Sequence, residues 1–289
     1  AAHADYESKA YGLFVHYISQ YDAWGGCTYT DGTLVKTVDE LAAAFNAAQF
    51  AKDANDFGVE YIVLTVWHGD TRALFPSMTN ERWRDNRRST AGAKSYADRD
   101  VIQDLLDALA PYGIDLYLYT HPCDGHDFTE EDQALTGWND SGNSYGVWNQ
   151  YINELYYELC ERYGTQIKGL WFDGMYNHIA NNGPQQRLKA TCLTFNPGMI
   201  LTMNTGFTEG KLNIASGYTG ADYKAWEVNR RVDYVNDMAF SRYQSAIVLA
   251  GAGWWADKPK SAQIKSQSAE DLYRYITAMA SISTHGGFL

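Results

Sequence analysis

Short runs of apolar residues alternate with longer segments of helical spacing along most of the chain. The runs at 11–17, 61–67, 114–120, 169–174, 199–203 and 246–250 are largely continuous, which is typical of strands buried on both faces. A less regular candidate strand covers 223–228, and the last one covers 286–289. Helical spacing predicts helices between them at 39–57, 98–112, 147–163, 185–195 and 269–283.

Regular alternation of buried strands with helices predicts parallel βα units. Eight such units in 289 residues favour an α/β fold of the (β/α)8 TIM barrel type, irregular or truncated at its last unit. No linker or repeat interrupts the pattern, so we expect one domain over residues 1–289. The sequence contains neither GxGxxG after the first strand nor GxxxxGK[ST], which argues against nucleotide binding.

Composition narrows the choice of partners. The balance of 23 Lys and Arg against 35 Asp and Glu gives a net charge of −12, which repels nucleic acids and anionic membranes. No run of 18 apolar residues is present to span a membrane. The basic residues at 82–88 are mixed with acidic ones, so we expect a solvated loop there. The 9 Trp, 22 Tyr and 11 Phe suit a site that stacks on flat ligand faces such as sugar rings.

The four cysteines are Cys27, Cys123, Cys160 and Cys192, and none forms a CxxC pair. This spacing argues against zinc-ribbon and thiol redox motifs, and Cys160 and Cys192 fall in helical patterns as expected of buried thiols. The chain opens with Ala-Ala-His and no methionine, from which we expect an extracytoplasmic protein. The oligomeric state is not predicted.

Polar residues with catalytic chemistry stand at the ends of four predicted strands: His16, His68, His121 and Asp173. The carboxyl ends of parallel strands share one rim, so these side chains are predicted to converge on one pocket. For Asp173 alone, capping of the next segment is an equal interpretation. Three histidines and one aspartate can also bind a transition metal, but no HxH or HxxxH pair is present. We therefore predict no metal and no cofactor.

A pocket of imidazoles, aromatic rings and carboxylates suits hydrolysis of a glycosidic bond, a reaction that needs two carboxyl groups. Glu227, near the end of the strand predicted at 223–228, is the best candidate for the second one. A salt bridge from Glu227 to Arg230 or Arg231 at the barrel rim is the structural alternative. Rival acids nearby are Asp222, Asp233 and Asp237.

Several segments resemble α-L-fucosidases, glycoside hydrolase family 29: 12–16, 61–75 and 170–174, with similar blocks at 98–100, 118–119 and 286–289. The resemblance implies that Asp173 is the nucleophile and that Glu227 is the acid/base. It also implies that His16, His68, Tyr119 and Trp171 contact the sugar. Trp254 resembles an aromatic residue beside the pocket, although core packing is an equal reading. Trp67 and His121, at the same strand ends, complete the predicted sugar contacts.

Three departures from the family pattern bear on specificity. Gly69 replaces the second of two adjacent histidines, Tyr17-Ile18 replaces Trp-Gly, and Trp24–Cys27 stands near a missing Glu-Trp pair. Loss of an imidazole donor commonly changes which sugar is accepted. We predict a retaining exo-glycoside hydrolase of the α-L-fucosidase type that releases a terminal sugar from fucosylated glycans or oligosaccharides. The alternatives are a related barrel acting on another glycoside, such as a galactoside, and a non-catalytic sugar-binding relative.

Overall fold

The computed structural model describes most of the amino-terminal two thirds of the chain and short segments beyond it. The described residues are 2–9, 12–19, 29, 31, 33–123, 125, 127–174, 184–204, 207–208, 211–212, 222–228 and 243–247. Of these, 3, 143, 184–186, 207–208, 211–212, 223–228 and 243–247 are described by their backbone alone. The helix predicted at 269–283 and the strand predicted at 286–289 lie outside the described residues.

Seven strands form one parallel sheet, in the order of their appearance along the chain. This order is that of an α/β barrel, as the sequence predicts. A separate antiparallel pair joins β6, Phe207–Thr208, to β7, Lys211–Leu212. The strands of the sheet are β1 Gly12–Val15, β2 Tyr61–Thr65, β3 Asp115–Thr120, β4 Gly169–Phe172, β5 Ile200–Met203, β8 Tyr223–Val228 and β9 Tyr243–Ile247.

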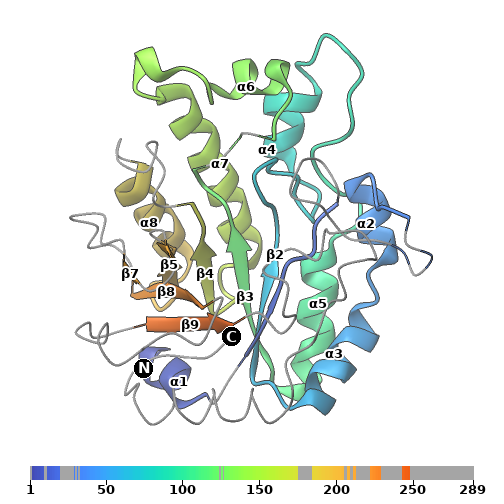
Figure 1. Cartoon of the computed structure of the whole chain (residues 1–289), viewed down its shortest axis with the longest axis vertical. Coiled ribbons are helices and arrows are strands. Elements are labelled where there is room, and N and C mark those ends of the chain that lie inside the picture. Colours follow the sequence, from blue (N-terminus) through green and yellow to red (C-terminus); the bar gives the residue numbers. More distant parts are fainter. Residues whose placement is uncertain are drawn as a thin grey trace.

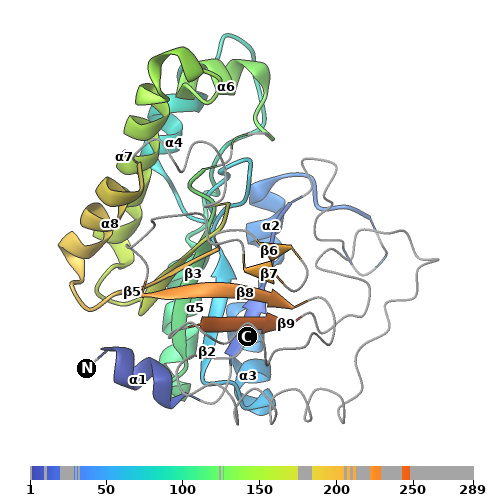
Figure 2. The ribbon, with the colours of Figure 1, turned by 60° about the vertical axis from the view of Figure 1, so that its left-hand side comes forward.

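Helices flank the strands, with α3 packed beside α5 and α7 beside α8 (Figures 1 and 2). None of the described helices is long and apolar enough to cross a membrane. The helices are α1 Ala2–Ser8, α2 Val38–Ala44, α3 Ala47–Phe57, α4 Met78–Asn80, α5 Val101–Leu109, α6 Glu130–Thr136, α7 Gly146–Tyr163 and α8 Pro184–Phe195; the short turns are η1 Glu81–Asp85, η2 Ala110–Tyr112 and η3 Ser141–Asn143.

The prediction of one helix over 39–57 is wrong, because two helices occupy this segment. The backbone becomes extended at Phe45, whose ring is buried against Tyr17 and Phe50. Asn46 then caps the second helix, since its side chain accepts a hydrogen bond from the Gln49 N–H at 3.0 Å. Burial of one ring and a new cap together outweigh the helical tendency of the alanine-rich sequence.

Two apolar layers lie on opposite faces of the strands. Alternate strand residues such as Ile62, Leu64 and Leu118 pack against the helices in the larger layer. The other layer is aromatic and includes Tyr61, Tyr117, Tyr119 and Trp171. Tyr6 of α1 packs against Tyr61 and Tyr117, at the amino ends of β2 and β3 (Figure 1). Helix α1 therefore covers the end of the barrel opposite to the predicted site.

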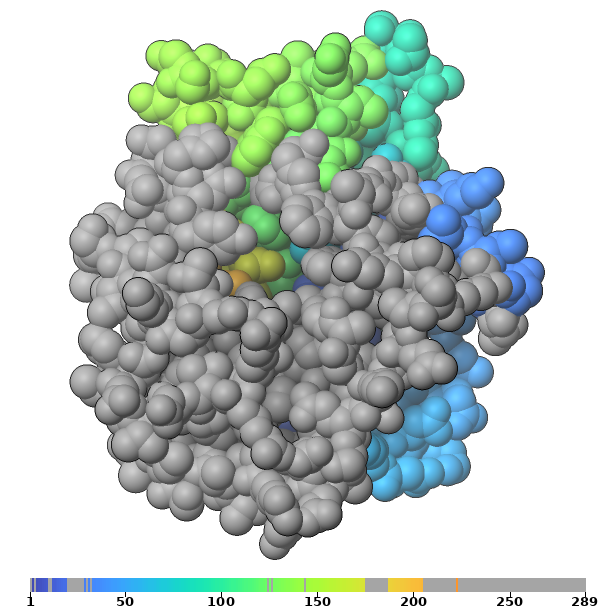
Figure 3. All heavy atoms as spheres, viewed as in Figure 1, coloured from blue at the N-terminus to red at the C-terminus, as the bar shows by residue number. Residues whose placement is uncertain are grey.

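The segments after β2 and β3, which carry α4 and α6, project above the carboxyl ends of the strands (Figure 1). Their atoms form the upper part of the surface in Figure 3. The prediction of a solvated loop at 82–88 is wrong, because this segment contains η1 and buries Arg84, which is 1% exposed. Arg84 is buried because it is paired with the carboxylate of Asp132 on α6, 2.8 Å away.

Candidate active site

Asp173 directly follows β4, at the carboxyl end of the sheet. Its N–H donates to the carbonyl of Thr120 at 2.9 Å, which extends the pairing of β3 with β4 by one residue. The next residue, Gly174, has a left-handed φ of +67°, and a Cβ there would lie 2.0 Å from Cε1 of His121. A glycine is therefore required both by the turn and by the imidazole packed against it.

Three neutral donors hold the carboxylate of Asp173. The Tyr119 hydroxyl donates to Oδ2 at 2.5 Å. The Gly174 N–H and the Asn204 amide both donate to Oδ1, each at 2.8 Å. Among the described residues, Asp173 forms no ion pair with a lysine or an arginine. Its charge is thus stabilised by hydrogen bonds rather than paired with a lysine or an arginine.

The three predicted histidines converge beside this carboxylate. The ring centroids of His16 and His68 are 5.8 Å apart, and those of His68 and His121 are 5.4 Å apart. The Nδ1 atom of His16 also lies 3.3 Å from the hydroxyl of Thr65, which anchors this ring to β2. The predicted convergence of the strand ends is therefore confirmed for His16, His68, His121 and Asp173.

Burial and charge set the ionisation of the pocket. Burial lowers the pKa of His16 to about 4, although Asp173 acts in the opposite direction. Burial, with help from His121 and His16, lowers the pKa of His68 to about 3. Burial raises the pKa of Asp173, but His121, the Tyr119 hydroxyl, His68 and the Gly174 N–H outweigh burial and bring that pKa below its ordinary value. At neutral pH the site combines an ionised carboxylate with two neutral imidazoles.

Stacked aromatic rings form one side of the site. Tyr119 stacks on Trp171 with ring centroids 5.3 Å apart, and lies parallel to His68 at 5.8 Å. Phe14 packs edge-on against Trp171. Among the described residues, the buried Trp171 Nε1 has no hydrogen-bond partner. This wall therefore offers both an apolar face and an indole donor.

The other predicted site residues take different positions. Trp67 is 1% exposed, packs against Tyr156 of α7, and donates from Nε1 to the carbonyl of His121 at 3.4 Å. It supports His121 from the helix side of the strands, and its contact with a sugar stays a prediction. The Glu227 backbone lies in β8, but its side chain is outside the described part, as are Asp233, Asp237 and Trp254. The carboxylate of Asp222 accepts from the Leu201 N–H at 2.9 Å.

Sequence reasoning missed Asn204, which follows β5 and bonds directly to Asp173. The signal was available, because Asn204 is a polar residue at a strand end, like the four residues that were singled out. Among the described residues, no group of three or more His, Cys, Asp or Glu side chains is arranged to bind a metal ion.

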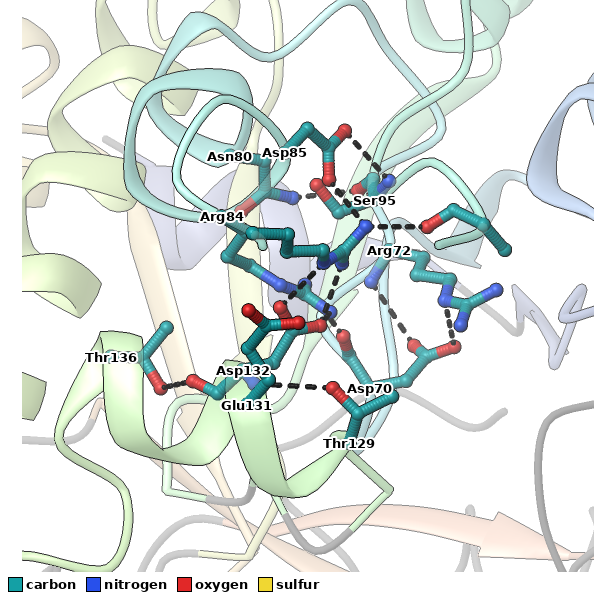
Figure 4. A network of polar contacts seen from close by, with 12 residues as sticks. Asp70, Arg72, Asn80, Arg84, Asp85, Ser95, Thr129, Glu131, Asp132 and Thr136 are labelled. Carbon is teal, nitrogen blue, oxygen red and sulfur yellow. Dashed lines mark hydrogen bonds and ion pairs between the residues drawn. The ribbon is translucent and has the colours of Figure 1, made fainter. Parts of the chain in front are cut away.

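A buried polar network supports the loop that carries His68 (Figure 4). Thr71, in this loop, has a φ of +45°, which is rare for a β-branched residue. Its carbonyl accepts from Asn80 at 2.7 Å, and its hydroxyl lies 2.9 Å from that of Tyr151. Arg84 donates to the carbonyl of Asp70 at 2.9 Å and to the Thr71 hydroxyl at 3.1 Å. These contacts hold the turn in its strained conformation.

Comparisons with known proteins identify the family of the chain. The family model described as alpha-L-fucosidase matches residues 5–266. Alpha-L-fucosidase 1 of Arabidopsis thaliana is 32% identical over 139 residues, which are 45% of this chain and 22% of that protein. The chain thus matches about a fifth of the length of this relative.

Solved structures show the same fold. An alpha-L-fucosidase from Bacteroides thetaiotaomicron has a TM-score of 0.68 at 17% identity, covering 99% of this chain and 67% of its own. The unliganded alpha-L-fucosidase AlfC from Lactobacillus casei has a TM-score of 0.65 at 16% identity, covering 100% and 90%. The fold is therefore the α/β barrel of these enzymes. Because the family model spans most of the sequence, the chain belongs to the alpha-L-fucosidase family.

Proposed function

We propose that the protein is a retaining exo-acting α-L-fucosidase that releases terminal L-fucose from glycans or oligosaccharides. The observation that carries this proposal is the state of Asp173. Its carboxylate is half-buried at the barrel rim, held by three neutral donors, and has a lowered pKa. A carboxylate that stays ionised with no lysine or arginine paired to it among the described residues suits attack on an anomeric carbon and stabilisation of an oxocarbenium-like transition state.

In this mechanism Asp173 displaces the leaving oxygen from the anomeric carbon, while Glu227 gives that oxygen a proton. Glu227 then takes a proton from water, which attacks the anomeric carbon and frees Asp173. The strand register supports Glu227. Trp171 pairs with Thr202 and Thr202 with Tyr223, so Glu227 falls in the same alternating set of strand residues as Trp171 and Asp173. We expect the two carboxyl groups to lie about 5–5.5 Å apart.

The pocket wall suits a sugar with one apolar edge. His16 and His68, neutral at pH 7, each offer one donor and one acceptor to hydroxyl groups. The stacked rings of Tyr119 and Trp171 present an apolar surface to the remaining edge, where fucose carries a methyl group. Proteins with the same fold add support. One from Bacteroides thetaiotaomicron was trapped as a covalent intermediate with 2-fluoro-fucosyl fluoride, and AlfC was seen with 4-nitrophenyl-α-L-fucopyranoside.

Azide rescue of two carboxylate variants tests the proposal. Asp173→Ala should fold and lose turnover of 4-nitrophenyl α-L-fucoside by roughly 10⁴-fold or more. Azide should restore release of nitrophenol and yield a fucosyl azide of inverted configuration. Glu227→Ala with azide should yield the azide of retained configuration, because Asp173 still forms the intermediate. Wild-type rates in Asp173→Ala would refute the nucleophile assignment.

A panel of nitrophenyl α-L-fucoside, β-D-galactoside and α-L-arabinoside tests the sugar. The proposal expects the highest kcat/KM on the fucoside. A preference for the galactoside would leave the two-carboxylate chemistry in place and change the specificity. Binding without nitrophenol release from any member would identify a non-catalytic sugar-binding protein.

A further inference from the structure

Asn204 is a buried polar residue that has no role in the mechanism proposed above. It is 2% exposed and directly follows β5. Its N–H donates to the carbonyl of Phe172 at 2.8 Å, so its backbone is fixed by the pairing of β5 with β4. From this position its side-chain amide reaches Oδ1 of Asp173 at 2.8 Å.

The two oxygens of Asp173 are in different environments. Each carboxylate oxygen has about two lone-pair sites for hydrogen bonds. Among the described residues, Oδ1 uses both, on Gly174 and Asn204, whereas Oδ2 uses one, on the Tyr119 hydroxyl. Tyr119 belongs to β3 and its ring is parallel to that of His68, whereas Asn204 follows β5, so Oδ2 is held from the side of β3 and Oδ1 from the side of β5.

We propose that Asn204 is a positioning residue that holds Oδ1 as the non-attacking oxygen, so that Asp173 attacks through Oδ2. This inference rests on the proposed function and adds to it. A lone pair of Oδ2 forms the bond to the anomeric carbon, while the glycosidic C–O bond breaks and its electron pair leaves with the oxygen that the acid group protonates. In the second step water adds to the anomeric carbon, its proton passes to that same group, and the C–Oδ2 electron pair returns to the carboxylate.

The charge on Oδ1 changes in opposite directions in the two steps. In the glycosyl-enzyme Oδ1 is an ester carbonyl oxygen with little charge, and it regains charge when the ester is hydrolysed. A donor on Oδ1 therefore stabilises the product of the second step and favours hydrolysis of the ester. Removal of the Asn204 donor slows this step, but it leaves the free carboxylate less well stabilised and hence a better nucleophile in the first.

Asn204→Leu removes the amide at similar volume, and Asn196→Leu is a matched control. The side-chain amide of Asn196 is likewise a donor, but to the carbonyl of Gly164 at 2.9 Å, and Asn196 precedes β5 and forms no hydrogen bond with a site residue. With 4-nitrophenyl α-L-fucoside, we expect Asn204→Leu to lower kcat about tenfold to a hundredfold. KM should fall in parallel, kcat/KM should change little, and a burst of nitrophenol should appear. Asn196→Leu should show none of these changes.

A second measurement does not depend on turnover. Carboxyl ¹³C NMR, with the Asp173 resonance assigned through Asp173→Asn, should show a raised pKa of Asp173 in Asn204→Leu and in Asn204→Ala. An unchanged pKa, or a kcat that falls at constant KM without a burst, would overturn the inference. If the wild type hydrolyses no fucoside but the pKa of Asp173 still rises in the Asn204 variants, the proposed function is wrong. The positioning of Asp173 by Asn204 would then still be supported.

Discussion

Two polar regions lie at the carboxyl end of the barrel, and they differ in which groups accompany the negative charge of their carboxylate. In the network behind the His68 loop (Figure 4), Asp132 accepts from Arg84 at 2.8 Å and from Arg88 at 2.6 Å. Arg88 also pairs with Asp85 at 2.9 Å, so two arginines are balanced by two carboxylates. In the candidate active site, Asp173 receives only neutral donors among the described residues. The carboxylate of the network is thus paired with arginines, whereas that of the site is held by hydrogen bonds from uncharged groups.

This difference separates a structural from a chemical use of a carboxylate. A charge paired with arginine holds two segments together and has little field left for a ligand. A charge held by oriented dipoles keeps its field for a positive centre that develops during a reaction. The comparison predicts that changes in the network act mainly on stability, and that changes around Asp173 act mainly on rate.

The largest expected effect on stability is in the network. Asp132→Leu leaves the buried guanidinium of Arg84 without its carboxylate and takes one of two carboxylates from Arg88, which keeps Asp85. We expect it to lower the free energy of unfolding by about 3–5 kcal/mol. Asp56→Leu is the control, because Asp56 is paired with Lys52 on the exposed side of α3 and should change little. Urea denaturation measures both. A small effect of Asp132→Leu would mean that water replaces the lost partner.

The site itself should make stability depend on pH. Unfolded imidazoles titrate near pH 6.5, whereas the folded pKa values of His16 and His68 are about 4 and about 3. Between these limits the unfolded chain binds more protons, so the free energy of unfolding falls as the pH drops below 6.5. From pH 7.5 to 5.5 the two rings should cost roughly 2–3 kcal/mol. His68→Gln should remove about half of this dependence in denaturation curves, and an unchanged dependence would contradict the buried neutral state.

Features set by neighbouring residues in the sequence could be predicted, whereas features set by contacts between distant residues could not. Continuous apolar runs predicted the first five strands of the sheet, because a strand buried on both faces needs no distant information. The less regular segment 223–228 also forms a strand, whereas the strand predicted at 246–250 is observed at Tyr243–Ile247, three residues earlier. The convergence of His16, His68, His121 and Asp173 followed from the shared rim of parallel strands. Arg84 was misjudged because its partner, Asp132, is 48 residues away. Asn204 was missed because one asparagine after a strand is ordinary until the carboxylate beside it is known.

Substitution of two glycines with similar backbone conformations distinguishes the effect of backbone strain from that of a displaced His121. Gly174 and Gly113 have nearly equal φ values, +67° and +66°, but an added Cβ meets His121 only at Gly174 and nothing within 4 Å at Gly113. Gly113→Ala should cost about 1–2 kcal/mol from strain alone. Gly174→Ala should cost about 2 kcal/mol more and lower kcat, because the imidazole must move. Equal losses of stability with unchanged kcat would show that the position of His121 is unimportant.

The smallest expected effect concerns the single donor on the attacking oxygen. Tyr119→Phe keeps the ring stacked between His68 and Trp171 and removes only the hydroxyl that donates to Oδ2 at 2.5 Å. We expect kcat/KM on an aryl fucoside to fall about tenfold, near 1.4 kcal/mol, because Oδ2, the oxygen that attacks, loses the donor that fixes its direction, whereas Asn204 holds only Oδ1.

Tyr163→Phe is the matched control for this change. Tyr163 also donates its hydroxyl to a carboxylate, that of Asp100 at 2.8 Å, but on the helix side of the barrel. It should lower stability and leave kcat/KM unchanged. Because both variants remove the same group from a tyrosine–carboxylate pair, the pair of measurements isolates what position adds. Similar effects on kcat/KM would contradict the view that only the carboxylate at the rim acts on the substrate.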